Sequence, residues 1–329
     1  INTTTTPQDV VYTITPSDSA TGCIGTIFTI TITVNPKPSV IAPPTDTICS
    51  DTVLNHDLNN DIDLATGTFS WSASENPDLT GETTSTSTGD TITDTLTNIS
   101  GTAQTVTYTV TPTSADGCEG DSYTYVVTIN PEPFVASPPT DTVCSDIALN
   151  HDLNNDVNLT GVTFSWVAVD NPDVTGETIT TSTDANIIDT LTNTSGTAQT
   201  VTYTFTPTSA DGCEGDSYTY VVIINPEPFV GSSPTDTVCS DIALNHDLNN
   251  DVDLTGVSFS WSAADNPNVT GETITTSTNP NITDTLTNVS GTVQTVTYTI
   301  TPTTKDGCEG EPYTYEVTIN PEPFVASTP

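Results

Sequence analysis

Apolar and polar residues alternate in short runs along the whole chain. In "VTFSWVA", Phe164 and Trp166 share one parity, and in "VTYTFTP" Tyr203 and Phe205 do the same, while Thr and Ser fill the opposite positions. A period of two residues is that of a half-buried β-strand. Gly, Pro, Asn and Asp separate the runs, and no stretch keeps helical apolar spacing for more than a turn. The pattern predicts an all-β protein.

The runs recur with a fixed period. "INPEPFV" begins at 129, 224 and 319, and "DGCEG" begins at 116, 211 and 306, so both phrases step by 95 residues. A period near 95 residues, with about seven strands and a central Trp strand, is typical of an immunoglobulin-like sandwich. We predict tandem immunoglobulin-like β-sandwich domains arranged as beads on a rod. Their expected boundaries are 1–36 (C-terminal part of a truncated repeat), 37–133, 134–228, 229–323 and 324–329 (start of a further repeat).

The strongly negative net charge of the chain reduces the number of functions to consider. Two basic residues, Lys37 and Lys305, stand against 42 acidic ones, and the formal net charge is −40. Nucleic-acid binding is excluded, because neutralising phosphates needs Lys and Arg. An anionic membrane surface would repel the chain for the same reason. No run approaches the length of a transmembrane helix, so we expect no direct membrane insertion.

The repeated motifs also suggest a family. The series "CSD", "TFSW", "VTYT[FVI]TPT", "DGCEG" and "VTINPEP" resembles the PKD-like, immunoglobulin-fold repeats of very large secreted surface proteins of Bacteroidetes, including adhesins of gliding bacteria. The resemblance covers nearly the whole chain. It implies an extracellular location, on the bacterial surface or secreted, and neighbouring repeats in a longer chain as the first partners.

Seven cysteines have sequence gaps that alternate between 26 and 69 residues. The gaps allow pairing across the linker or within a copy. In a sandwich, the start of the first strand and the loop before the last strand lie at one pole, which favours pairing within a copy. Such bridges form in oxidising compartments, outside the cytoplasm. The predicted bridges are Cys49–Cys118, Cys144–Cys213 and Cys239–Cys308, with the partner of Cys23 outside the chain.

The three histidines lie in one repeated phrase, "NHDLNND". Read as an extended strand, it has Leu and His on one face and Asp-x-Asn-x-Asp on the other. That spacing matches the start of a calcium loop, but the loop's glycine and bidentate acid are missing. Calcium is therefore the one candidate ion, and a polar outer face leading into a turn is the favoured reading. The candidate ligands are Asp57, Asn59, Asp61, Asp152, Asn154, Asp156, Asp247, Asn249 and Asp251.

The same phrase gives no case for catalysis. A His–Asp pair needs a nucleophile and an oxyanion site in a cleft, and nothing in the sequence marks either. A site repeated in every domain also fits construction better than catalysis. We therefore expect no enzyme activity, no catalytic residues and no organic cofactor.

Asp-Thr followed by an apolar residue recurs along the chain. This pattern resembles the O-glycosylation acceptor that Bacteroidetes use on exported proteins, although Thr is so abundant that chance explains part of it. The candidate acceptors are Thr47, Thr91, Thr95, Thr142, Thr190, Thr237 and Thr285.

Together these features predict an extracellular structural or adhesive filament, or stalk, built of disulfide-stapled acidic repeats. The alternative is an array of modules that bind surface carbohydrate or protein, with calcium in the binding loops. Lateral self-assembly of chains into fibres is a further expectation. The near-identity of the copies makes periodic lateral contacts possible. The negative charge opposes them unless cations lie between the chains.

Overall fold

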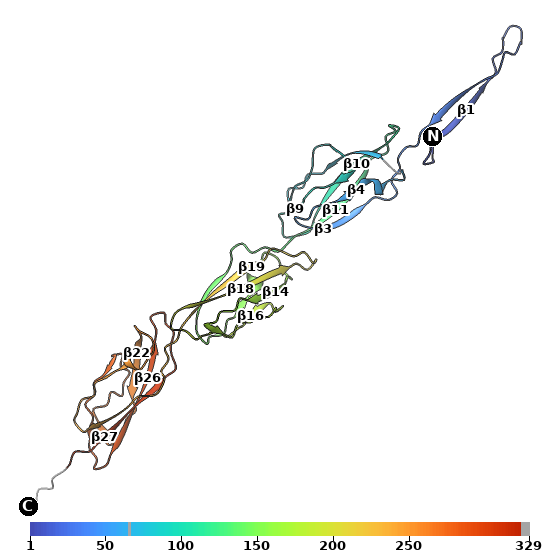
Figure 1. The fold of residues 1–329 in the computed structure, drawn as a ribbon. Coiled ribbons are helices and arrows are strands. Elements are labelled where there is room, and N and C mark those ends of the chain that lie inside the picture. Colours follow the sequence, from blue (N-terminus) through green and yellow to red (C-terminus); the bar gives the residue numbers. More distant parts are fainter. Residues whose placement is uncertain (65–66, 324–329) are drawn as a thin grey trace, which may run out of the picture. The chain divides into compact units, whose positions relative to one another are not determined.

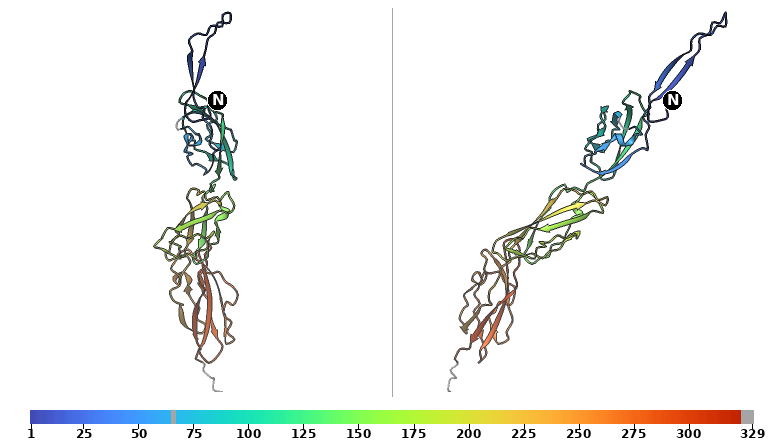
Figure 2. Two further views of the ribbon diagram at one scale, coloured as in Figure 1. Left: turned by 90° about the vertical axis from the view of Figure 1, so that its right-hand side faces the viewer. Right: turned by 45° about the vertical axis from the view of Figure 1, so that its right-hand side comes forward.

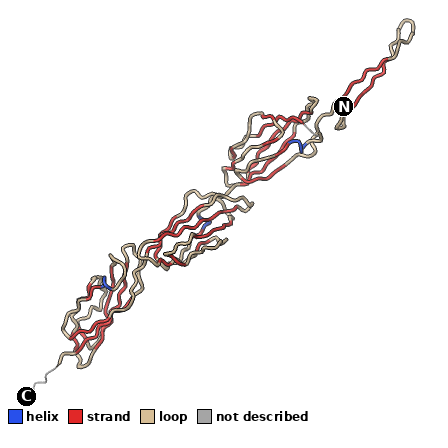
Figure 3. Tube along the Cα trace, in the orientation of Figure 1, coloured by secondary structure: helices blue, strands red, loops and turns tan. Residues whose placement is uncertain are grey.

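The computed structural model describes residues 1–64 and 67–323. Within them the secondary structure consists of β-strands and three short 3-10 helical turns (Figure 3). The three long repeats each form a β-domain, and an isolated hairpin of β1 (Gln8–Ile14) and β2 (Phe28–Val34) precedes them (Figures 1 and 2). The prediction of an all-β protein is confirmed. The predicted start of a further repeat at 324–329 lies outside the described residues.

The three repeats contain corresponding elements. Those of the first are β3 (Thr45–Cys49), β4 (His56–Asp57), η1 (Leu58–Asp61), β5 (Gly67–Ala73), β6 (Leu79–Thr80), β7 (Ser87–Thr88), β8 (Thr91–Ile92), β9 (Thr97–Asn98), β10 (Gln104–Ser114) and β11 (Tyr123–Asn130). Those of the second are β12 (Thr140–Cys144), β13 (His151–Asp152), η2 (Leu153–Asn155), β14 (Thr163–Ala168), β15 (Val174–Thr175), β16 (Asn186–Ile187), β17 (Thr192–Asn193), β18 (Gln199–Thr208) and β19 (Tyr218–Asn225). Those of the third are β20 (Thr235–Cys239), β21 (His246–Asp247), η3 (Leu248–Asn250), β22 (Ser258–Ala263), β23 (Val269–Thr270), β24 (Asn281–Ile282), β25 (Thr287–Asn288), β26 (Gln294–Thr303) and β27 (Tyr313–Asn320).

One main sheet organises each repeat. In the first repeat its strand order is β3-β11-β10-β5-β7, and the second and third repeats have the orders β12-β19-β18-β14 and β20-β27-β26-β22. The last two long strands pair antiparallel. The five-residue first strand pairs parallel with the last strand, which places Cys49 opposite Asn130. The end of the first strand therefore lies where the chain leaves the repeat.

The core lies between this sheet and a second layer of short strand pairs. In the first repeat, Leu58 and Leu96 of the second layer pack with Trp71 and Tyr108 of the main sheet in one buried cluster. The alternation read from the sequence sets the inward face, since Phe164, Trp166, Tyr203 and Phe205 are all buried in the second repeat. Thr and Ser at the other parity are more exposed along β18.

Contact density divides the described chain into two units. Among the described residues, the first contains 1–64 and 67–134 together with 157–163 and 207–216, and the second contains 135–156, 164–206 and 217–323. Two segments of the second repeat thus belong with the first repeat. Nothing in the structure tests the boundaries predicted from the sequence period, which remain predictions.

The disulfides differ from those predicted within copies. Cys49 is bonded to Cys213, and Cys144 is bonded to Cys308, so each bridge joins one repeat to the next. Cys118 and Cys239 are free thiols, and Cys23 is free and exposed. The predicted pairs Cys49–Cys118, Cys144–Cys213 and Cys239–Cys308 are therefore wrong.

The physical reason for the error is the position of each cysteine along the first strand. The cysteine ends this strand rather than starting it, and the strand runs parallel to the last one. Its side chain therefore lies at the exit pole of its own repeat, whereas the "DGCEG" hairpin precedes the last strand at the entry pole. The hairpin of the following repeat is the one within reach.

Candidate functional site

The phrase "NHDLNND" does not form one extended strand. His56 and Asp57 make the short strand β4, paired with β8, and the 3-10 turn η1 begins at Leu58. Asp57 caps this turn, because its Oδ1 accepts hydrogen bonds from the backbone N–H of Asn59 at 3.0 Å and from its Nδ2 at 3.0 Å. A side-chain acceptor at this position satisfies an N–H group that the turn leaves unpaired. The first acid and the amide thus stabilise a turn.

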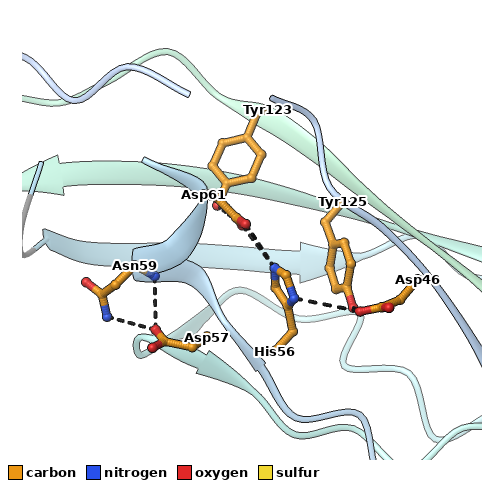
Figure 4. Close-up of polar contacts among 7 residues, drawn as sticks. All are labelled: Asp46, His56, Asp57, Asn59, Asp61, Tyr123 and Tyr125. Atoms are coloured by element: carbon orange, nitrogen blue, oxygen red, sulfur yellow. Dashed lines mark hydrogen bonds and ion pairs between the residues drawn. The ribbon is translucent and has the colours of Figure 1, made fainter. Parts of the chain in front are cut away.

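The turn directs Asp61 inward, where it joins the histidine. His56 Nε2 lies 3.0 Å from Asp61 Oδ2, and the Tyr123 hydroxyl donates to the same oxygen at 2.8 Å. The imidazole stacks on the ring of Tyr125 with centroids 4.0 Å apart, and Tyr125 donates to Asp46 at 3.0 Å (Figure 4). Asp61 has only 6% of its surface exposed. The assignment of this acid to an outer face is therefore wrong.

The contact between histidine and acid and the stacking on a tyrosine recur in the other repeats. His151 lies 2.8 Å from Asp156 and stacks on Tyr220, and His246 lies 2.8 Å from Asp251. Asp152 and Asp247 cap their turns as Asp57 does, and the hydrogen bonds from Asn154 and Asn249 hold the pKa values of these two carboxyls below their usual range.

The geometry favours a structural role for the cluster. Burial, followed by the hydrogen bonds to Asp61 and Asp46, raises the pKa values of Tyr123 and Tyr125, which keeps both phenols protonated as donors. The described contacts of His56 are with carboxylates and a phenol, and none is with a Ser, Thr or Cys nucleophile.

The candidate calcium ligands are not gathered around one point. Asp57 and Asn59 bond to each other while Asp61 turns to His56. In the described ranges, no group of three or more His, Cys, Asp or Glu residues has the arrangement to hold a metal ion. Calcium binding at the nine candidate residues stays a prediction.

A second acid that accepts several hydrogen bonds occurs in each repeat and was missed in the sequence analysis; it is buried in the first repeat and partly buried in the other two. Asp94 accepts hydrogen bonds from the Thr83 N–H at 2.8 Å, the Thr83 hydroxyl at 2.7 Å and the Tyr108 hydroxyl at 2.8 Å. Asp189 and Asp284 make the same contacts in the other repeats. The sequence pattern could have indicated that Asp94 faces inward, because it alternates in step with the buried Ile92 and Leu96.

The candidate glycosylation sites lie mostly at the surface. Six of the seven threonines are exposed, and Thr91 is half-buried. Their modification stays a prediction. The exposed ones are Thr47, Thr95, Thr142, Thr190, Thr237 and Thr285.

The junction between repeats is the other distinctive site. On one side of it, the Ser50 N–H donates to the Asn130 carbonyl at 2.9 Å. On the other side, the Phe134 N–H donates to Asn158 Oδ1 at 2.7 Å, and the Asn158 N–H donates to the Phe134 carbonyl at 3.2 Å. Only residues 131–133, "PEP", remain between these anchors, and two of the three are prolines with fixed φ. The linker is therefore short and stiff.

The second glycine of "DGCEG" is required by this linker. A Cβ on Gly215 would lie 2.0 Å from the Pro133 carbonyl oxygen, and a Cβ on Gly310 would lie 2.3 Å from the corresponding oxygen of Pro228. No side chain fits at that distance. The hairpin of one repeat thus packs directly against the linker that enters it, and this contact explains why the two motifs recur together.

The disulfide lies alongside this linker. Cys49 is paired with Asn130, the last residue before the linker, and Cys213 is two residues before Gly215. The Cα atoms of the bridged cysteines are 5.5 Å apart at the first junction and 5.4 Å apart at the second. Each junction therefore has two covalent connections, a peptide of three residues and a disulfide.

A crevice of about 500 Å³ opens beside the second junction. Its lining includes Asp146, Glu227, Phe229, Glu311 and Tyr313. Burial, then the charges of Asp146 and Glu311, raises the pKa of Glu227 above its ordinary value. At the first junction, burial and the charges of neighbouring carboxylates likewise raise the pKa of Glu132.

Glu227→Gln is expected to raise the thermal midpoint at pH 7, because it removes a partly buried charge beside two like charges. A raised folded-state pKa means that the folded chain binds more protons than the unfolded chain between the ordinary pKa and the raised one. Stability contributed by this group is therefore lost as pH rises through that window. The gain from Glu227→Gln should shrink as the pH falls toward the ordinary value.

Thermal melts at pH 7 and pH 4 check this. Glu316→Gln, which removes the same charge from an exposed position on β27, is the matched control. Equal gains from both variants at pH 7 would show that net charge alone acts.

Fold and junctions together define a class: a tandem array of immunoglobulin-like β-sandwiches, joined pairwise by disulfides. Models of the PKD-like domain match residues 1–38, 46–133, 141–228 and 236–323, and the chain belongs to this family. The predicted resemblance to PKD-like repeats is confirmed. A search of curated protein sequences finds no relative.

Solved structures with a similar fold have low sequence identity. The titin I-band fragment I67–I69 is 11% identical at a TM-score of 0.38, covering 87% of this chain and 99% of its own. Drosophila N-cadherin EC1–4 is 10% identical at a TM-score of 0.26, covering 97% and 84%. The SGBP-B protein of the Bacteroides ovatus mixed-linkage glucan utilization locus, solved with a mixed-linkage heptasaccharide, is 17% identical at a TM-score of 0.20, covering 88% and 71%. None of the helical turns in the described part of the chain is long and apolar enough to cross a membrane.

Proposed function

We propose that the chain is a segment of an extracellular structural or adhesive filament, and that its work is mechanical rather than catalytic. The observation that carries this proposal is the pair of disulfides at successive junctions, each beside a three-residue linker. A bridge within a domain would stabilise only that domain. A bridge between domains also limits the angle and separation of neighbours, which is useful for a stalk and unnecessary for an independent binding module.

The location follows from the same bridges. Disulfides persist in oxidising environments and are rare in the cytosol, so the array acts at the cell surface or in the secreted fraction. Its net charge of −40 keeps such an array soluble and makes it repel anionic surfaces. Assembly of several chains into a fibre would need divalent cations between them, and O-glycans on the exposed threonines would add further hydration.

A second candidate function is recognition of carbohydrate or protein. The observation that favours it is the junction crevice, where Phe229 has 67% of its surface exposed beside Asp146, Glu227 and Glu311. An exposed aromatic ring can stack on a sugar, and the carboxylates beside it can accept hydrogen bonds from the sugar hydroxyls. Calcium would enter this alternative as a bridging ion.

The two functions are separated by binding the full oxidised chain to a glycan array, with calcium and with a chelator. The filament proposal expects no binding above background in either condition. It also expects antibodies against the chain to label intact producing cells and to lose that label after external protease. Calcium-dependent glycan binding that Phe229→Ala abolishes would favour recognition, and labelling only after lysis would reject the surface location.

Negative-stain images of the same chain, with calcium and with chelator, test lateral assembly. Bundles that form only with calcium would support cation-bridged fibres, and single particles in both conditions would reject them.

A further inference from the structure

We propose that the junction bridges convert this tandem array into two continuous covalent tracks, which carry tension past the bodies of the repeats. The biological use of the tracks rests on the mechanical function proposed above, but their existence does not. The order of the bridged cysteines along the chain is the first observation. Cys49 pairs with Cys213 and Cys144 pairs with Cys308, so the second bridge starts inside the first loop and ends outside it. The two loops therefore overlap in sequence over residues 144–213.

One track begins in the first repeat. It runs along β3 to Cys49, crosses the disulfide to Cys213, continues along β19 and passes through the peptide linker into β20, which ends at Cys239. At the first junction this track uses the disulfide, and at the second junction it uses the peptide.

The other track alternates in the opposite sense. It runs along β11, passes through the peptide linker into β12, reaches Cys144, crosses the disulfide to Cys308 and continues along β27. Every junction is therefore crossed by one track through a peptide and by the other track through a disulfide.

The two tracks account for the alternating spacing of the cysteines along the sequence. The segments of 26 residues, such as Cys213 to Cys239, contain the last strand, the linker and the next first strand, which are the track pieces. The segments of 69 residues, such as Cys144 to Cys213, contain the rest of a sandwich. The sandwich bodies therefore connect the tracks from the side: tension along either track bypasses them, and they carry it only where it passes from one track to the other.

The tracks lie against each other inside a repeat. In the second repeat, β12 and β19 pair parallel, with Cys144 opposite Asn225. In the third repeat, β20 and β27 pair in the same way, with Cys239 opposite Asn320. The hydrogen bonds of a parallel pair are evenly spaced along the strands, so the two tracks are also joined to each other through the sheet.

The bridges limit how far the chain can lengthen. Without them, 259 residues separate Cys49 from Cys308, a contour of about 900 Å at ~3.5 Å per residue. With both bridges closed, the shortest covalent path crosses each disulfide and the 69 residues between Cys144 and Cys213, about 240 Å. The difference of about 650 Å is chain length that tension cannot extract.

Single-molecule pulling from the two ends of the full chain tests the proposal. After complete unfolding, the oxidised chain should have a contour about 650 Å shorter than the reduced chain. The sharper measurement uses Cys144→Ser/Cys308→Ser under oxidising conditions. Because the loops overlap, the remaining bridge still hides 164 residues, so this variant should lengthen by only about 90 Å relative to the unmodified chain.

Cys118→Ser/Cys239→Ser is the matched control, since it makes the same chemical change at two free thiols and should leave the contour unchanged. Separate loops within each repeat would give a different result, because either double variant would then open two loops of 69 residues and lengthen the chain by about 480 Å. That result, or equal contours for oxidised and reduced chains, would overturn the proposal. A failed surface-labelling experiment would leave this measurement unaffected, so the two proposals fail separately.

Discussion

Asp94→Ala is expected to destabilise the first repeat by about 3 kcal/mol, lowering its thermal midpoint by about 10–20 °C. Asp94 is buried and accepts three hydrogen bonds, and its removal leaves the fully buried Tyr108 hydroxyl and the Thr83 N–H without their acceptor. An unpaired buried donor costs the full loss of its hydration, which exceeds the net value of the bond itself. Calorimetry of the full chain should show one of its transitions shifted down.

Two variants control this experiment. Asp90→Ala removes an exposed carboxylate four residues away and should change the midpoint by no more than about 2 °C. Tyr108→Phe removes one donor and leaves the carboxylate with its two bonds from Thr83, so its effect should be smaller than that of Asp94→Ala. Equal melting temperatures for Asp94→Ala and Asp90→Ala would show that the hydrogen bonds to Asp94 do not stabilise the repeat.

Cys49→Ser/Cys213→Ser is expected to have the second large effect. The bridge closes 164 residues, and the chain-entropy estimate for a loop of that length is about 5 kcal/mol for joint unfolding of the repeats that it connects. Denaturant melts should show the first two repeats unfolding earlier. Cys118→Ser/Cys239→Ser is the control for loss of cysteine and should unfold like the unmodified chain.

Counting free thiols in denatured, oxidised protein checks the pairing directly. The unmodified chain should have three alkylatable thiols, Cys23, Cys118 and Cys239. The count should stay at three in Cys49→Ser/Cys213→Ser and fall to one in the control variant. Pairing within repeats would instead give one thiol in the unmodified chain and three in the control, which would contradict the junction bridges.

Much of the fold was predictable because it depends on short-range pattern. Strand alternation identified the inward residues Trp166, Tyr203 and Phe205, and the 95-residue period identified the tandem organisation. Thr on the opposite parity is compatible with a solvent-facing sheet surface, so local propensity and burial agree along these strands.

The cysteine pairing could not be read in the same way. The pairing depends on the first strand being only five residues long and lying parallel to the last strand. This arrangement belongs to the tertiary structure and has no local sequence pattern. The pairings considered from the sequence joined cysteines that are neighbours in order, whereas the true partners have two other cysteines between them. The prediction that the histidine phrase forms one extended strand was wrong for a local reason. Asp57 caps a turn that begins at Leu58, and this turn brings Asp61 inward.

The close packing of the second "DGCEG" glycine against the linker proline affects how such arrays can change length. Each junction takes one half of its parts from the repeat before it and the other half from the repeat after it, and successive copies are nearly identical in these parts. Loss or duplication of any whole unit of 95 residues therefore brings together a complete junction, with its glycine, its linker and both cysteines. Recombination between copies can lengthen or shorten the array in steps of one domain without creating a defective joint, whereas a shift of any other size leaves a cysteine without its partner.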